Sequence, residues 1–283
     1  MSTVASSTRR TVAYDPVGWW VYLALLAGCA FALGPFLILI STAFKTDTQI
    51  YSGSAWELPA PVTFEHFHSA IERDVLGRLL FTFLVAAVMT AGQVIFSSLA
   101  AYAFARLRFP GRDLLFWSYL STLMIPNVVT VIPLFVLVQR LGLSDSFAAI
   151  VLPYVLGTPF GVFLLRQYFL TLPKDLEAAA SLDGAGPFRT YLTVIMPLSR
   201  PIVSTLALMT FVFGWNNYLW PLIASNSEST RVLTVMIAAL NSNYVTDVGT
   251  MMAISLIATA PLLIVFLVFQ KQIVRSIALS GFK

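Results

Sequence analysis

The stretch "GWNNYLWPL", residues 214–222, carries side chains that could bind a solute. Asn216 and Asn217 each offer an amide donor and acceptor that suit hydroxyl groups. Trp215 and Tyr218 offer ring faces that can stack on sugar rings. Trp and Tyr also gather at membrane interfaces, and Asn side chains hydrogen-bond neighbouring helices. Two interpretations therefore stay open for these four residues: contact with a polyhydroxylated solute, or packing between helices.

Catalytic and metal-binding motifs are absent from the sequence. It contains no G-x-x-x-x-G-K-[ST] nucleotide loop, no Gly-rich dinucleotide fingerprint, no H-E-x-x-H metal helix and no G-x-S-x-G elbow. The two histidines, His66 and His68, lie two residues apart on a predicted short helix, where their side chains point in different directions. We therefore expect surface histidines, no metal site, no catalytic site and no cofactor bound by this chain.

The stretch "EAAASLDGAG", residues 177–186, interrupts an otherwise apolar chain. Pro173 suits the first turn of a helix, and Glu177 lies near the positive end of that helix dipole. The alanines favour helix and leave a low surface, and the glycines at 184 and 186 end the helix before Pro187 begins a second short one. The pattern predicts two short helices joined by a sharp turn. They could dock another protein or lie on the bilayer as an amphipathic connector.

Composition places these stretches in a membrane protein. Of 283 residues, 58% are hydrophobic and 11% charged, against about 25% charged in soluble proteins. Six charge-free runs reach the roughly 20 residues needed to cross a bilayer. We expect an all-α polytopic fold with six transmembrane helices, at about 17–43, 79–105, 114–138, 147–166, 201–224 and 249–270. The charge-free run 232–246 is too short to span, and predicts a loop with a short interfacial helix.

The distribution of Lys and Arg predicts the orientation, because cytoplasmic loops retain positive charge. Twelve of the 17 basic residues fall in the tails and in alternate loops on one side: Arg9, Arg10, Arg106, Arg108, Arg112, Arg166, Lys174, Arg189, Arg200, Lys271, Arg275 and Lys283. This places a tail at 1–16, a loop at 171–199 and a tail at 276–283 in the cytoplasm, around a membrane domain at 17–275. The external segment 45–77 is expected to hold an amphipathic helix with Phe64, Phe67 and Ile71 on one side.

The string Glu177-Ala178-Ala179, then Asp183-Gly184-Ala185, then "IMPL" at 195–198 resembles the EAA motif of permease subunits in binding-protein-dependent ABC importers. Three further stretches are similar to the carbohydrate-uptake branch of that family, and specifically to its smaller maltose-importer permease. They are "AYAFARLRFPGR", "GWNNYLWPL" and the C-terminal residues 275–283. The resemblance covers the chain from about residue 17 to its end.

This resemblance implies a type I ABC importer permease fold and a set of partners. The partners are a second permease forming a heterodimer, two copies of a cytosolic ATPase that bind ATP and Mg, and an extracytoplasmic solute-binding protein. In the family the EAA loop is a coupling helix in a groove of the ATPase. On that basis Glu177 makes polar contacts with the ATPase, Ala178 and Ala179 allow a close fit, and Gly184 allows the turn, with Asp183 and Ala185 in the same motif.

The resemblance also implies the cargo and the location. The solute would be a sugar, an oligosaccharide or a polyol such as a glycerol phosphate derivative, and the outer loop 223–249 would face the binding protein. The chain would lie in the cell (inner) membrane of a bacterium or archaeon, with lipid and no nucleic acid as a partner.

Three alternatives remain open at this stage. The first is an ABC permease for another solute class, such as amino acids or peptides. The second is a secondary carrier, which usually keeps an ionisable residue within the membrane; the six runs contain none. The third is a membrane-embedded enzyme, for which no catalytic pair stands out.

Overall fold

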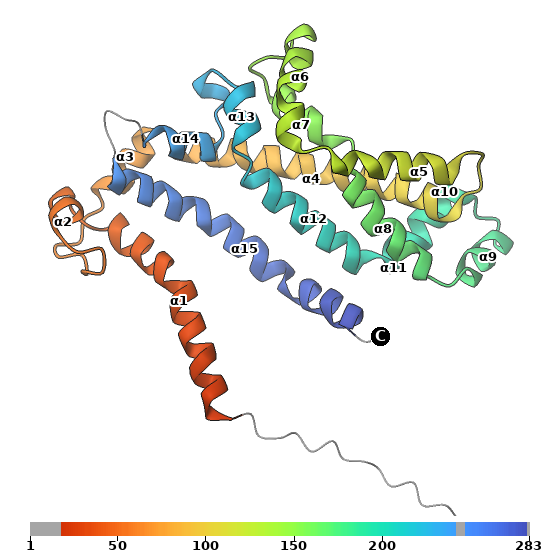
Figure 1. Cartoon of the computed structure of the whole chain (residues 1–283), viewed down its shortest axis with the longest axis horizontal. Helices are drawn as coiled ribbons and strands as arrows, with labels where there is room; N and C mark the ends of the chain where they lie inside the picture. The colour runs from red at the N-terminus through yellow and green to blue at the C-terminus, as the bar shows by residue number, and fades with distance from the viewer. Residues whose placement is uncertain (1–17, 242–246, 282–283) are drawn as a thin grey trace, which may run out of the picture.

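The computed structural model describes residues 18–241 and 247–281 (Figure 1). Every element in these ranges is a helix, which agrees with the predicted all-α membrane fold. Four helical segments are long and apolar enough to cross a membrane: Trp19–Ala43, Val75–Arg106, Phe147–Thr171 and Val248–Val268. The number rises to six if each of two sharply bent helix pairs counts as one span. The predicted N-terminal tail at 1–16 lies outside the described residues.

Helix α4 (Val75–Arg106) is the central element of the bundle, with α7, α8 and α12 packed along it (Figure 1). Its 32 residues extend about 48 Å at 1.5 Å each, more than the roughly 30 Å of a hydrocarbon core. Small residues let the neighbours approach closely. A Cβ added to Gly92 would lie 2.2 Å from the Val155 Cγ2 atom and 2.5 Å from the Val155 carbonyl oxygen. Close contact through such residues drives helix association where lipid supplies no hydrophobic contrast.

Two of the predicted spans, 114–138 and 201–224, contain breaks in the structure. The first consists of α5 (Arg112–Ser121), the short η1 (Thr122–Met124) and α6 (Asn127–Arg140), with a bend of 101°. Pro126 lacks an amide hydrogen and begins the new helix. The second ends at Trp215, where α12 (Arg200–Trp215) gives way to α13 (Leu219–Ala224).

The fourth predicted span, at 147–166, consists of α7 (Phe147–Val155) and α8 (Pro159–Thr171), with residues 156–158 between them. The prediction of one span missed this break, although Gly157, Thr158 and Pro159 are typical of one helix ending and the next beginning. Thr158 caps α8, since its hydroxyl accepts from the Gly161 amide at 3.2 Å.

Helix α1 (Trp19–Ala43) lies at one side of the bundle, where it packs against α15 (Val248–Gly281) (Figure 1). Most of its surface is uncovered, and the side chain of Phe31 is 87% exposed. The α15 backbone continues to Gly281, so most of the predicted C-terminal tail at 276–283 continues that helix, and residues 282–283 lie outside the described ranges.

The segment between α1 and α4 folds around a buried lysine. The Lys45 Nζ atom donates to the carbonyl oxygens of Ser54 at 2.9 Å and Ala55 at 3.2 Å, next to α2 (Asp47–Ser52). His66, on α3 (Glu65–Glu72), is buried with its Nε2 atom 2.9 Å from the Lys45 carbonyl oxygen. The prediction of a surface position is therefore wrong for His66, although His68 is exposed.

The face of α3 that packs on the bundle also differs from the prediction. It presents His66 and Ala70, while Phe64 and Ile71 are more than half exposed. The position of α15 explains the difference: a Cβ at Gly249 would lie 2.1 Å from the His66 ring, so the imidazole fills the space left at this glycine.

Two segments that connect the spans are also helical. The segment after α8 contains α9 (Asp175–Leu182), α10 (Pro187–Thr190), the π-helical turn η2 (Tyr191–Ile195) and α11 (Met196–Leu198). The loop 225–247 contains η3 (Glu228–Thr230) and α14 (Leu233–Ala239), the latter within the run predicted to hold a short interfacial helix.

Candidate functional site

The turn after α9 is formed by a glycine in the left-handed region. Gly184 has φ +80°, and a Cβ there would meet no atom within 4 Å. The Gly184 amide donates to the Ser181 carbonyl at 3.0 Å, and the Ala185 amide donates to the Ala180 carbonyl at 2.9 Å. These two bonds make a Schellman motif, which satisfies carbonyls at the helix end and turns the chain sharply. The two-helix unit predicted from "EAAASLDGAG" is thus formed by local hydrogen bonds.

The predicted coupling residues divide into an outward and an inward group. Ala178, Ala179, Asp183 and Gly184 are exposed, while Ala185 is half-buried. Two apolar side chains join the outward surface: Leu182 is 90% exposed and Phe188 is 65% exposed. An apolar group on a short connector outside the spans needs cover from another surface. The loop 171–199 is called the coupling segment after its predicted role, and Ala178, Ala179, Leu182, Gly184 and Phe188 are called its outward face.

Glu177 points inward. Its Oε1 atom lies 2.8 Å from the Nε atom of Arg106, the last residue of α4, and the Arg106 side chain is only 3% exposed. The Arg106 Nη2 atom donates to the carbonyl oxygens of Phe169 at 2.6 Å and Leu172 at 2.7 Å. One guanidinium therefore joins the end of α4, the end of α8 and the start of α9. Sequence analysis missed this role, although Arg106 is the first charge after the run 79–105.

The residues predicted to contact solute are separated in the structure. Trp215 is buried and stacks on Phe211, with ring centroids 5.8 Å apart, in a cluster with α15. Asn216 donates from Nδ2 to the Val212 carbonyl at 2.9 Å, and Tyr218 is 41% exposed. The Asn217 side chain lies beside the hydroxyl of Tyr154.

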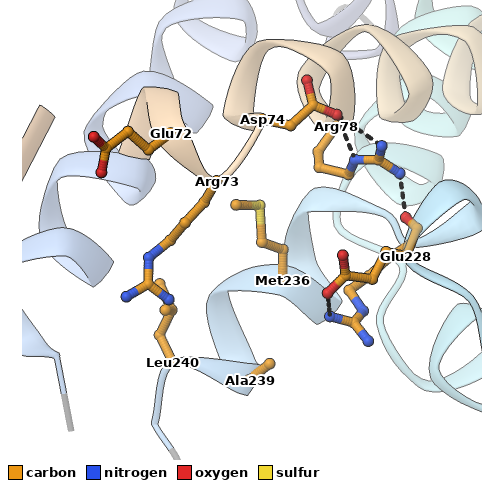
Figure 2. A pocket seen from close by; sticks show the side chains of 9 residues that line it. Glu72, Arg73, Asp74, Arg78, Glu228, Met236, Ala239 and Leu240 are labelled. Carbon is orange, nitrogen blue, oxygen red and sulfur yellow. Dashed lines mark hydrogen bonds and ion pairs between the residues drawn. The ribbon is translucent and has the colours of Figure 1, made fainter. Parts of the chain in front are cut away.

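A cavity of about 360 Å³ at the Val75 end of α4 is lined by charged groups on and next to α3, α4 and η3, and by apolar groups of α14 (Figure 2). Figure 2 shows Arg78 directed at Asp74 and at the Glu228 backbone carbonyl; Arg78 Nη2 lies 2.7 Å from Asp74 Oδ2. The other lining charges are also paired, as Arg73 with Asp247, Arg231 with Glu228 and Glu72 with His68. The network joins outer elements to one another and presents no unpaired charge to a solute.

A second set of bonds joins two further loops. Asp145 Oδ1 accepts from the backbone amides of Asn226 at 2.9 Å and Ser227 at 3.0 Å, and from the Thr230 hydroxyl at 2.5 Å. The Ser227 amide, then the Thr230 hydroxyl and the Asn226 amide, hold the pKa of Asp145 well below its usual range. The ionised carboxylate thus fastens the loop before α7 to the loop after α13.

A cavity of about 580 Å³ lies where the broken helices meet. Its walls come from α4, α12, the break before α6 and the break before α8. Gln93 lines it from α4 and is 3% exposed. Sequence analysis missed Gln93, yet a signal was present: it is the one amide side chain in the run 79–105, and polar residues within spans mark pathways.

The sequence that forms this architecture matches a known protein family. Residues 93–279 match the family model described as "Binding-protein-dependent transport system inner membrane component". The chain belongs to this family. The match includes α9, its turn and the 580 Å³ cavity, and it confirms the resemblance drawn from the EAA motif. The chain is accordingly a multi-pass membrane component of a binding-protein-dependent transport system.

Curated relatives align along nearly the whole chain. The probable ABC transporter permease protein YurM of Bacillus subtilis is 33% identical, over 99% of this chain and 93% of the relative. The sn-glycerol-3-phosphate transport system permease protein UgpE of Yersinia enterocolitica is 31% identical, over 90% and 94%. The trehalose transport system permease protein SugB of Mycobacterium tuberculosis is 31% identical, over 94% and 97%.

A solved structure shares the fold. A chain of a bacterial ABC transporter involved in the import of the acidic polysaccharide alginate superposes with a TM-score of 0.79 at 24% identity. The match covers 89% of this chain and 95% of the other. The permease fold is therefore that predicted from the sequence.

Proposed function

We propose that this chain is a transmembrane subunit of an ATP-driven ABC importer and forms half of the translocation pathway for a sugar or sugar-like solute. The observation that carries the proposal is the outward face of the coupling segment, an exposed small-residue helix and turn in a chain of the binding-protein-dependent transport family. The solute class is supported by two relatives, whose names give sn-glycerol-3-phosphate and trehalose as what they transport.

The partners proposed are a second permease, two copies of a cytosolic ATPase and an extracytoplasmic binding protein. The apolar, mostly exposed α1 supports the first of these, since a neighbouring permease would cover it. ATP and Mg²⁺ bind the ATPase subunits in this scheme, and the chain itself catalyses no covalent step. Both termini lie in the cytoplasm, as the positions of Lys and Arg indicate.

The structure supports a division of labour within the coupling segment. Ala178, Ala179 and Gly184 form a surface of small side chains that packs closely against the ATPase, and Leu182 is the apolar contact. Asp183 and Ala185 complete the turn. Glu177 holds α9 to α4 through Arg106, so that a displacement of α9 pulls directly on a membrane-spanning helix. In this scheme the glutamate acts within the chain, in place of the contact with the ATPase that the family resemblance implied.

The test compares two exposed leucines. Leu182→Glu places a charge on the outward face, and Leu58→Glu makes the same change on the outer segment, where Leu58 is 77% exposed. We expect Leu182→Glu to lower co-purification of the ATPase and solute-stimulated ATP hydrolysis by about tenfold or more, the effect of losing an interface anchor. Leu58→Glu should leave both unchanged. Equal behaviour of the two variants, with both proteins inserted in the membrane, would show that the segment is only a connector.

A further inference from the structure

The cavity of about 580 Å³ at the broken helices lies at the depth of the membrane spans. Irregular backbone at that depth is tolerated where it lines a water-filled cavity or is buried in protein. Two breaks reach this one space, at Pro126 before α6 and at Thr158 before α8. Discontinuous helices of this kind form the solute sites of many transporters.

In the wall of this cavity, one hydrogen-bonding atom of Gln93 has no partner among the described residues. Its Nε2 atom donates to the Tyr154 carbonyl at 2.7 Å, and this carbonyl fixes which end of the amide is the donor. The amide hydrogen of Thr158, four residues after Tyr154, donates to the Ser97 hydroxyl at 3.4 Å. In an unbroken helix the Thr158 amide would donate to the Tyr154 carbonyl. The break leaves this carbonyl free to accept from Gln93. The Gln93 Oε1 atom is buried and has no hydrogen-bond partner in the described part of the chain. A buried acceptor left unpaired is costly, so it calls for a ligand.

The rest of the wall defines what that ligand is. No Lys, Arg, Asp or Glu lines the cavity, so nothing there compensates a charged group. Phe160 and Phe213 are each partly exposed, and Phe213 packs edge-on against Tyr154 with ring centroids 5.5 Å apart. Apolar walls with a few convergent polar groups are typical of small-molecule sites. Ring faces beside an amide acceptor suit the C–H face and the hydroxyl groups of an uncharged sugar unit.

We propose that this cavity is a solute subsite in this chain, in which Gln93 Oε1 accepts a hydrogen bond from a hydroxyl of an uncharged sugar unit. The subsite presupposes that the chain is a permease of the class proposed above. It lies apart from Trp215 and Asn216, which line a separate cavity of about 130 Å³ between α12, α14 and α15. Asn217 does not line this cavity, but its side chain lies beside the hydroxyl of Tyr154, which does.

The experiment uses the assembled transporter with its binding protein in proteoliposomes. Trehalose and maltose are compared first with glycerol 3-phosphate, and the sugar that more strongly stimulates wild-type ATP hydrolysis is used for uptake; stimulation by glycerol 3-phosphate alone would overturn a subsite for an uncharged unit. Gln93→Leu removes the acceptor, and Gln139→Leu, an exposed position at the far end of α6, is the matched control. Met209→Trp fills the cavity from α12 without touching the bond between Gln93 and Tyr154.

We expect Gln93→Leu to lower the uptake rate at subsaturating sugar by about tenfold, as for one lost hydrogen bond to a buried partner. Met209→Trp should lower it by at least as much, because the indole occupies the space of the sugar. Gln139→Leu should match wild type, and all three assemblies should keep their ATPase subunits. If wild type transports a sugar and Met209→Trp transports it equally well, the subsite is overturned while the permease function stands. If no solute stimulates wild-type ATP hydrolysis, the proposed function itself fails.

Discussion

At the scale of single residues, the contact between Arg106 and Glu177 decides how the coupling segment is held. Their 2.8 Å ion pair is nearly dry on the arginine side, and Glu177 is 23% exposed. Breaking a buried pair by removing one partner leaves an uncompensated charge, which costs more than the pair contributes. Arg106 also donates to two carbonyl oxygens, and a lysine cannot reproduce that planar fork.

Arg106→Met should therefore lower the free energy of unfolding by about 3 kcal/mol, the lower end for a buried pair because Glu177 keeps some exposure. Thermal melting of the purified chain in detergent measures the change, with Arg108→Met at a neighbouring exposed arginine as the control. In a double-mutant cycle, Glu177→Gln should add little to Arg106→Met. Additive effects of the two substitutions would mean that the pair is not the relevant contact.

At the scale of elements, the breaks in the helices and the close contacts of α4 depend on each other. Gly92 allows the α7 carbonyl of Val155 to approach α4, and the next residue, Gln93, donates to the freed carbonyl of Tyr154. A hydropathy profile predicts the length of a span, but it does not take contacts between helices into account. It therefore does not indicate that the span predicted at 147–166 divides into α7 and α8.

Gly92→Ala should destabilise the bundle by about 1–3 kcal/mol, because its Cβ would overlap both the side chain and the backbone of Val155. Gly28→Ala on α1 is the matched control, since a Cβ there meets nothing within 4 Å and alanine favours helix. Melting temperatures in the same detergent compare the two. A Gly92→Ala protein as stable as Gly28→Ala would show that the close contact between α4 and α7 does not contribute to the stability of the bundle.

At the scale of the whole molecule, charge and exposure together define how the chain sits in its membrane and its assembly. The coupling segment and the charged network around Arg78 occupy separate ends of the described fold, one after α8 and the other at the start of α4 (Figure 1). The exposed surface of α1 and the outward face of the coupling segment are uncovered apolar surfaces in the chain alone. A lone chain therefore presents surfaces that only lipid or a partner can cover.

The orientation gives a direct prediction. Green fluorescent protein fused after Lys283 should fluoresce in cells, because the C-terminus is placed in the cytoplasm, where this reporter folds. Alkaline phosphatase inserted after Gly53, in the segment that follows α2, should be active because it is placed outside. Swapping the two reporters provides the control at each site. An active phosphatase at the C-terminus would reverse the assignment and place the coupling segment on the wrong side for an ATPase.

The sequence by itself determined the membrane class, the all-α fold and the turn of the coupling segment. These depend on local properties: charge-free runs of sufficient length, alanines that favour helix, and a glycine at residue 184 that can take a positive φ. Only the tertiary structure decided that Glu177 faces Arg106 and that Gln93 meets a helix break. Those partners lie 71 and 61 positions apart along the chain, so no local pattern brings them together. Packing around α4 does so.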